Sequence, residues 1–359
     1  MTDTHIKGLR LYLPPFAPDT AGAASVAFPT GGLTVIIDAG GCAGNICGFD
    51  EPRWQSDTAA VMSAGLRDMD AIMGRDDRLL DKIERALSQI NASHITLIST
   101  PVPAVIGTDL HALKRLLARR CGLPTAIIAS DGTHAYDRGA SEAYMGLLTA
   151  LLEPDTASLP DSIGVWGATP LDITAADADQ LRHQLHAKGC QHVFLYGLDK
   201  GPDPYRSAAA VERNIVIAPS GLAPARYLEQ HYQIPYTVAQ PLASQQLESL
   251  FPAAAGVLPA ARQHVLILHQ QIAANALRQA MWQHLGSAAP RITCATFFAQ
   301  DEAYREPDDV QFTEEYEFQE WVADNDPDFI IADRLYQRAL PAWHGMFLDY
   351  PHFAVSGER

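Results

Sequence analysis

One stretch near the start of the chain reads Leu33-Thr34-Val35-Ile36-Ile37-Asp38-Ala39-Gly40-Gly41-Cys42. Its first five residues are aliphatic or β-branched, which is typical of a strand buried on both faces. An aspartate, two glycines and a cysteine follow closely and indicate a turn at the end of that strand. The stretch therefore predicts a strand inside a parallel sheet, with a chemically distinctive loop at its carboxyl end.

Similar short apolar runs recur along the chain and alternate with amphipathic stretches. Strands are predicted over 33–38, 95–99, 125–129, 162–166, 192–196, 214–218, 265–268, 292–297 and 329–332. Helices are predicted over 76–90, 109–120, 175–188, 222–231, 272–285 and 315–324. This alternation predicts βαβ units. We expect an α/β protein with three Rossmann-like domains, each with a parallel sheet flanked by helices.

The chain has 359 residues, enough for two or three domains. A Pro-containing stretch at 153–160 and an Ala/Pro-rich stretch at 251–261 are plausible linkers. We predict an N-terminal α/β domain over 1–157 that carries the cysteine loop, a middle α/β domain over 158–257 and a C-terminal α/β domain over 258–359.

Charge and cysteine usage limit the class of protein. The chain has 26 Lys and Arg against 42 Asp and Glu, a net charge of −16, with no block of basic residues. A nucleic-acid or anionic-membrane partner is therefore not expected. No signal layout and no apolar run near 20 residues is found, and five cysteines do not form a disulfide framework. These features predict a soluble cytoplasmic protein with reduced thiols.

The segment that carries most chemistry runs from Asp38 to Trp54 and contains four glycines and two cysteines. Glycines beside a cysteine let backbone N–H groups approach its sulfur, and such hydrogen bonds tune iron–sulfur clusters. The spacing lets the sulfurs of Cys42 and Cys47 reach one cluster. We predict Cys42 and Cys47 as metal ligands, with Gly40 and Gly41 as further cofactor contacts.

Other interpretations of the cysteines remain open. Zinc is less favoured, because no second Cys or His pair stands at a matching spacing. Two free, buried cysteines in a glycine-rich turn would explain the pattern equally well. Cys121, Cys190 and Cys294 lie in or beside apolar strands or helix ends and are predicted to be core residues.

Two further loops carry polar residues, and the absence of several motifs limits the classes of enzyme to consider. The loop at 99–110 follows a strand, and Thr108 or Asp109 is a plausible N-cap for the next helix. The loop at 131–139 is polar, and His134 in it is either a proton donor or a solvated side chain. The chain has no phosphate-binding P-loop, dinucleotide fingerprint, nucleophile elbow or His-Glu-x-x-His helix.

Several segments, in order, resemble the nitrogenase component 1 family. They are 36–42, 71–79, 95–110, 131–139, 214–222 and 234–236. The resemblance implies three α/β domains per subunit and an iron–sulfur cluster held between the first domains of two subunits. It also implies a separate ATP-hydrolysing [4Fe-4S] reductase, which docks over the cluster and delivers electrons. In this comparison Cys42 matches the family cysteine that closes the first strand–turn motif.

The chain departs from the family pattern at two ligand positions. The usual cysteine near the N-terminus is replaced within Leu13-Pro14-Pro15-Phe16-Ala17-Pro18, and the family Cys-Pro reads Thr100-Pro101. Of three usual ligands only Cys42 is kept, and Cys47 is a possible substitute. No obvious cysteine and histidine pair for a nitrogenase-type metal cofactor is found, although Cys294 and His269 lie in the third domain. The resemblance therefore does not extend to dinitrogen reduction.

Ligand counting allows two assemblies. A homodimer would supply four thiolates from two copies of Cys42 and Cys47, the number that a [4Fe-4S] cluster needs. A heterodimer with a homologous subunit, which supplies most ligands, is the arrangement we favour. Residues 44–54 and 100–109 would form the docking surface for the reductase. Substrate contacts are expected from 167–170, 220–221 and 269–271.

The function that we predict from the resemblance is that of an oxidoreductase subunit. It would belong to the catalytic component of a nitrogenase-like reductase, and an interface cluster would relay electrons from the ATP-dependent iron–sulfur reductase to an unidentified substrate. A scaffold or assembly subunit, which hosts a cofactor or supports a homologous active partner, is the alternative. A small-molecule-binding protein without a cluster is a third hypothesis.

Overall fold

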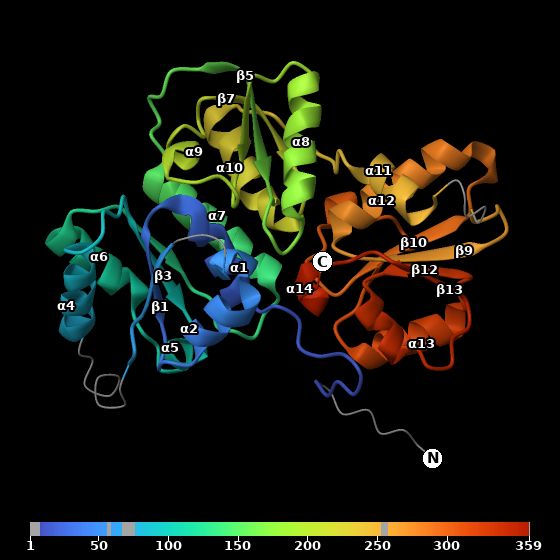
Figure 1. Ribbon diagram of the computed structural model, residues 1–359, viewed down its shortest axis with the longest axis horizontal. Helices are drawn as coiled ribbons and strands as arrows, with labels where there is room; N and C mark the ends of the chain where they lie inside the picture. Colours follow the sequence, from blue (N-terminus) through green and yellow to red (C-terminus); the bar gives the residue numbers. More distant parts are fainter. Residues whose placement is uncertain (1–7, 56–58, 67–75, 253–257, 359) are drawn as a thin grey trace. The chain divides into compact units, whose positions relative to one another are not determined.

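The computed structural model describes residues 8–55, 59–66, 76–252 and 258–358 (Figure 1). Parts of two predicted features, the 71–79 segment and the 251–261 linker, lie outside the described residues. The chain forms two compact units. One consists of Ala17–Val216 and Ser220–Thr237, and the other of Met1–Phe16, Ile217–Pro219 and Val238–Arg359. No described helix is long and apolar enough to cross a lipid bilayer.

The first sheet has the strand order β2-β1-β3-β4. Its strands are β1 (Leu33–Ile37), β2 (Ala60–Ser63), β3 (Ile95–Ser99) and β4 (Thr125–Ile128). All residues of β1 are buried, and Leu33 pairs in parallel with Ala60 on one side and Ile95 on the other. The predicted central strand is therefore confirmed, and its loop opens at the carboxyl edge of the sheet.

Helices cover this sheet. They are α1 (Asp19–Ala27), α4 (Asp76–Leu87), α6 (Leu110–Cys121) and α7 (Tyr136–Leu151), with the short helices α2 (Cys42–Asn45) and α5 (Pro101–Val105) in the loops. Leucines of α4 and α6 share a core with β1 and β3. The helices α1 and α7 pack closely, because a Cβ at Gly22 would lie 1.8 Å from the Tyr136 carbonyl oxygen. A Cβ at Gly139 would lie 1.8 Å from the Asp19 carbonyl oxygen.

The second sheet has the order β6-β5-β7-β8. Its strands are β5 (Leu159–Trp166), β6 (His192–Leu195), β7 (Val211–Val216) and β8 (Tyr236–Val238), and its helices are α8 (Ala175–Ala187), α9 (Asp203–Arg206) and α10 (Leu222–Tyr232). A buried aromatic group lies beside it. Trp166 stacks on Tyr196 with ring centroids 3.6 Å apart, and Tyr144 and Tyr205 meet Trp166 edge-on.

The third sheet has the order β11-β10-β9-β12-β13. Its strands are β9 (His264–Leu268), β10 (Arg291–Thr296), β11 (Val310–Gln311), β12 (Phe329–Ala332) and β13 (Met346–Asp349), and its helices are α11 (Ala243–Leu250), α12 (Gln271–Leu285), α13 (Glu315–Asn325) and α14 (Phe353–Ser356). If the five strands are numbered 1 to 5 along the chain, their order in the sheet is 3-2-1-4-5, which is the strand order of a Rossmann-type sheet. The expected α/β fold with three parallel sheets flanked by helices is confirmed.

The N-terminal segment packs with the third sheet's unit, which the sequence did not indicate. The backbone N–H groups of Leu11 and Leu13 donate to the buried Glu315 carboxylate at 3.0 and 2.7 Å. The ring of Phe16 meets the Phe297 ring at 5.5 Å. Each of the three predicted domain ranges contains one sheet, while the boundaries themselves stay predictions.

Candidate functional site

The cysteine loop leaves β1 at Asp38, whose side chain is fully buried. Its Oδ2 accepts the backbone N–H of Ala43 at 3.0 Å, and its Oδ1 accepts the hydroxyl of Ser63 on β2. The first N–H groups of a helix have no partner within the helix, so this carboxylate acts as a cap for α2. One buried side chain therefore fixes the start of the loop and ties it to the neighbouring strand.

Both cysteines of the loop are half-buried. Cys42 is the first residue of α2, and Cys47 lies in the π-helical turn η2 (Ile46–Asp50) that continues it. Burial raises the pKa of the Cys47 thiol, and the nearby Glu51 carboxylate raises it further. A metal binds the thiolate, so metal binding at Cys47 must release a proton that the protein holds firmly.

The remaining cysteines differ from these two. Cys190 and Cys294 are buried, as predicted. Cys121 is half-buried at the end of α6 and packs against the core of the first sheet.

The glycines of the loop face open space. A Cβ built at Gly40, Gly41, Gly44 or Gly48 would meet no described atom within 4 Å. Gly40 also has a φ of +115°, which favours glycine. The backbone around the two sulfurs is therefore accessible, so a cofactor or a second chain can approach it closely.

An ion pair fixes the far end of the loop. The Arg53 guanidinium donates to both oxygens of the buried Glu51 carboxylate, at 2.8 Å from Nε and 2.9 Å from a terminal nitrogen. Its terminal nitrogens also donate to the carbonyl oxygens of Gly197 at 2.8 Å and Ser25 at 2.5 Å. The sequence did not predict this set of hydrogen bonds, because two of the acceptors of Arg53 are carbonyl oxygens far away in the chain.

The two positions that lack the family cysteines are occupied by structural residues. Thr100 is fully buried, and its hydroxyl donates to the carbonyl oxygen of Ile37 at 2.8 Å. In the N-terminal stretch 13–18, Leu13 is buried within the other compact unit. Neither residue has the chemistry of a cluster ligand.

The loop after β3 presents apolar side chains. The short helix α5 and the residue after it expose Val102, Val105 and Ile106 by 45%, 86% and 49%. Because β1 and β3 pair in parallel, the loops that follow them lie at the same edge of the sheet. The predicted N-cap Asp109 is confirmed, since its side chain accepts the N–H of Ala112 at 2.8 Å.

The loop after β4 brings two carboxylates and an imidazole together. Ligand atoms of Asp19, Asp131 and His134 lie within 4.8 Å of one another, and neither loop cysteine belongs to such a three-ligand group within the described ranges. The buried Asp19 carboxylate accepts the N–H groups of Asp131 and Gly132 at 3.0 and 2.8 Å. His134 Nδ1 lies 3.0 Å from Asp131 Oδ1. These hydrogen bonds explain why the three side chains lie together: they hold the loop after β4 against the start of α1.

The expected substrate contacts at 269–271 are used inside their own unit. The ring of His269 stacks on Tyr350 and His352, each at 4.3 Å between centroids. The Gln270 amide donates to the Ile217 carbonyl oxygen at 2.9 Å. The Gln271 amide likewise donates to the Asp301 carbonyl oxygen at 2.9 Å. In this structure these side chains hold the loop itself.

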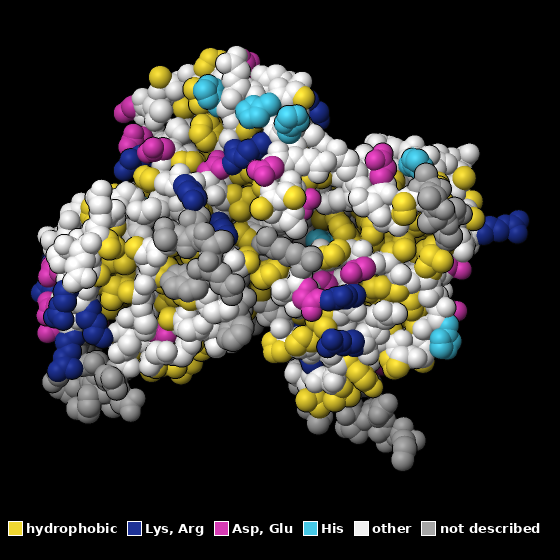
Figure 2. All heavy atoms as spheres, viewed as in Figure 1, with side chains coloured by type: hydrophobic (Ala, Val, Ile, Leu, Met, Phe, Trp, Pro, Cys, Tyr) yellow, Lys and Arg dark blue, Asp and Glu magenta, His cyan; other side chains and the backbone are white. Residues whose placement is uncertain are grey.

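The basic side chains of the described residues are scattered on one face of the protein. On the face shown in Figure 2, the Lys and Arg side chains of the described residues lie in small, separate groups. This arrangement agrees with the strongly acidic composition.

Solved structures and a curated protein show what the chain is similar to. Two solved structures, titled nitrogenase Cp1 at pH 6.5 and at pH 5, share the fold. Their TM-scores are 0.73 and 0.68 at 12% and 14% identity, covering 97% and 96% of this chain and 87% and 84% of theirs. The nitrogenase iron-molybdenum cofactor biosynthesis protein NifE of Bradyrhizobium diazoefficiens is 27% identical over 184 residues, 49% of this chain. The match spans only 32% of that relative's length.

The family model supplies the broadest match. The model described as nitrogenase component 1 type oxidoreductase matches residues 20–289. That range is well over half of the chain and includes the cysteine loop. The protein therefore belongs to the nitrogenase component 1 type oxidoreductase family.

Proposed function

We propose that this protein is a subunit of the catalytic component of a nitrogenase-like reductase. Cys42 and Cys47 would hold part of a [4Fe-4S] cluster at the contact with a second, homologous subunit. The observation that carries the proposal is the open cysteine loop. Its two thiols are half-buried, its glycines face open space, and its two ends are fixed by Asp38 and Arg53.

The donor set fits half of a cluster site. A [4Fe-4S] cluster takes four thiolates, and this loop offers two. A second subunit must supply the remainder, either as another copy of this chain or as a related chain that keeps the cysteines missing here. The open backbone at Gly41 and Gly44 leaves room for that approach.

The chain's own residues would position the ligands rather than react. Asp38 holds the first turn of α2, so Cys42 stays at the edge of the sheet. The pair of Glu51 and Arg53 anchors the turn after Cys47. The cluster, when bound, supplies one-electron transfer. Backbone N–H groups near the sulfurs would tune its potential.

The partner that delivers electrons would be an ATP-dependent [4Fe-4S] reductase. The docking surface that we propose consists of residues 44–48 together with Val102, Val105 and Ile106. Three exposed apolar side chains beside a glycine-lined loop suit a protein contact, because burying them is favourable.

A scaffold or assembly subunit is the second candidate. The similarity to NifE favours it, since that relative's name is that of a cofactor biosynthesis protein. The buried Thr100 favours it too, because at a position where the family keeps a ligand the side chain here hydrogen-bonds the last residue of β1 instead. A scaffold would hold a cofactor or a homologous partner without accepting electrons from the reductase.

Iron and sulfide analysis of anaerobically purified protein tests the site. We expect Cys42→Ala and Cys47→Ala each to reduce bound iron to background, because each removes a thiolate. Cys121→Ala is the matched control, since that thiol is also half-buried but lies at the end of α6. Iron content that is unchanged in both loop variants would remove the cluster from this loop.

A second measurement separates the two candidates. The protein is purified anaerobically with its genomic neighbours, and ATP-dependent bleaching of the cluster's visible absorbance is recorded. Reduction that requires both ATP and the neighbouring reductase supports the catalytic component. A cluster that is bound but never reduced in this way supports the scaffold.

A further inference from the structure

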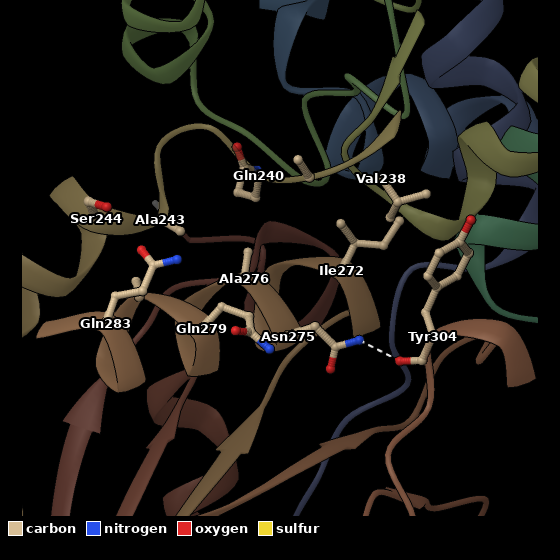
Figure 3. Close-up of a pocket in the computed structure, with 12 residues that line it drawn as sticks. Val238, Gln240, Ala243, Ser244, Ile272, Asn275, Ala276, Gln279, Gln283 and Tyr304 are labelled. Atoms are coloured by element: carbon tan, nitrogen blue, oxygen red, sulfur yellow. Dashed lines mark hydrogen bonds between the residues drawn. The ribbon is translucent and has the colours of Figure 1, made fainter. Parts of the chain in front are cut away.

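The compact unit of the third sheet contains a cavity that is separate from the cysteine loop. Its volume is about 300 Å³, at the lower end of the range for small-molecule sites. It lies between α11 and α12, next to the segment 238–240, and Tyr304 closes one end (Figure 3).

Two parallel rows of side chains on α12 form one wall. Ile272, Ala276 and Ala280 recur every four residues and make an apolar row, while Asn275, Gln279 and Gln283 make a row of carboxamides beside it. Residues four apart lie on the same face of a helix, so both rows run along the cavity. The small alanines of the apolar row leave space between α12 and α11.

The carboxamides differ in how they are held. Asn275 is fixed, because its Nδ2 donates to the Tyr304 carbonyl oxygen at 2.6 Å and its Oδ1 accepts from Arg278 at 2.8 Å. Gln240 lines the cavity from the segment across from α12 (Figure 3) and is only 6% exposed. Its Oε1 makes one long contact of 3.5 Å with the Leu242 N–H, and its Nε2 makes no hydrogen bond within the described residues. The Gln279 and Gln283 amides likewise have no partner among those residues.

The lining determines the class of ligand. It contains no Lys, Arg, His, Asp or Glu, so an ionised ligand would lose hydration without gaining an opposite charge. A hydrocarbon would leave several carboxamides without hydrogen bonds. Each carboxamide offers a donor beside an acceptor, which matches the edge of a nucleobase or of an aromatic amide.

We propose that this cavity binds an uncharged, planar heterocycle that carries a hydrogen-bond donor beside an acceptor, as nucleobases and aromatic carboxamides do. The apolar row of α12 covers the ring face, and Gln240 and Gln279 bind its polar edge. The site does not depend on the cysteine loop, so Cys42→Ala leaves it intact and the two proposals fail separately.

Equilibrium dialysis of the full chain with adenosine, uridine and nicotinamide tests this site. We expect saturable binding of at least one probe. Nicotinate is the matched charged ligand and should bind at least about tenfold more weakly than nicotinamide, the cost of desolvating a carboxylate. The uncharged requirement is wrong if nicotinate binds as tightly. The site is absent if none of the three probes binds at millimolar concentration.

Two variants place the binding in the cavity. Ala276→Leu fills the space and should abolish binding, and Gln279→Ala should weaken it about fivefold, as expected for one lost hydrogen bond. Ala223→Leu and Gln230→Ala make the same changes on α10, outside the cavity, and should bind normally. Gln279 is exposed, so its truncation should not disturb folding. Binding that survives both cavity variants would overturn the assignment.

Discussion

Asp38 shows how much a single residue contributes to the proposed site. Its carboxylate accepts hydrogen bonds from both α2 and β2 and is fully buried. We expect Asp38→Asn to lower the free energy of unfolding by about 1–3 kcal/mol, because an amide nitrogen would face a donor. It should also reduce bound iron. Denaturant unfolding and iron analysis measure the two effects.

Ser63→Ala is the graded control for that prediction. It removes only one of the two partners of Asp38 and should cost less than Asp38→Asn. If Asp38→Asn keeps both its stability and its iron, the carboxylate does not organise the loop.

Thr100 gives a second prediction for one side chain. Thr100→Val keeps the shape but removes the hydroxyl that donates to Ile37, so it should cost about 1 kcal/mol of unfolding free energy. Thr100→Ser keeps that hydroxyl and should cost less. Chemical denaturation compares the two, and equal stability of wild type and Thr100→Val would show that the hydrogen bond contributes nothing.

For single residues, the sequence was enough to predict the candidate ligands. It did not predict the residues that hold the cysteine loop in place. Cys42, Cys47 and the glycines are recognisable from residue type and spacing. The partners Ser63, Ser25 and Gly197 are not, because they approach the loop only after distant strands and helices have packed. The roles of Cys42 and Cys47 as ligands stay predictions.

At the scale of whole elements, the close packing of helix α1 against helix α7 gives a testable prediction. Gly22→Ala would place a methyl group 1.8 Å from the Tyr136 carbonyl oxygen, so the helices must separate. We expect a loss of about 1–3 kcal/mol, as for other overpacked cores. Thermal unfolding of the full chain measures it.

Gly44→Ala is the matched glycine substitution. Gly44 lies in α2 with open space around it, so alanine should leave stability equal or slightly higher. Its effect should appear only when a second subunit or the reductase binds. Equal melting temperatures for Gly22→Ala and wild type would contradict the close packing of α1 on α7.

The strands that sequence patterns missed share a physical cause. All nine predicted strands and six predicted helices are present, with small shifts at their ends. The strands β2, β8, β11 and β13 were not predicted, and each lies at the edge of its sheet. These four edge strands are short and partly exposed, so they lack a continuous buried run. The start of α7 looked like a loop, because Gly139 there serves the contact with α1.

For the whole molecule, two buried histidines should make stability depend on pH. Burial lowers the pKa of His94 and of His352 from 6.5 to about 4. The unfolded chain therefore binds protons first as the pH falls. Stability is fully present above about pH 6.5 and is lost progressively toward pH 4. At about pH 5 the loss should be about 2 kcal/mol for each histidine.

Urea unfolding at about pH 7 and pH 5 measures this loss. His94→Gln and His352→Gln should each flatten the dependence, because glutamine does not titrate. His192→Gln is the matched control, since it makes the same substitution at an exposed position. A slope that is identical in all three variants would contradict the assignment to the buried imidazoles.

The hydrogen bonds from residues 11–13 to Glu315 have a consequence for biosynthesis. One compact unit is continuous from Ala17 to Thr237 apart from three residues, while the other combines residues 8–16 with residues far along the chain, after Thr237. The first of these units can therefore fold during translation, before the rest of the chain has been synthesised. The second unit cannot fold completely until Glu315 has emerged from the ribosome exit tunnel, and until then residues 8–16 lack their binding partner. A chaperone that binds nascent chains would therefore have residues 8–16 as a substrate until Glu315 is made.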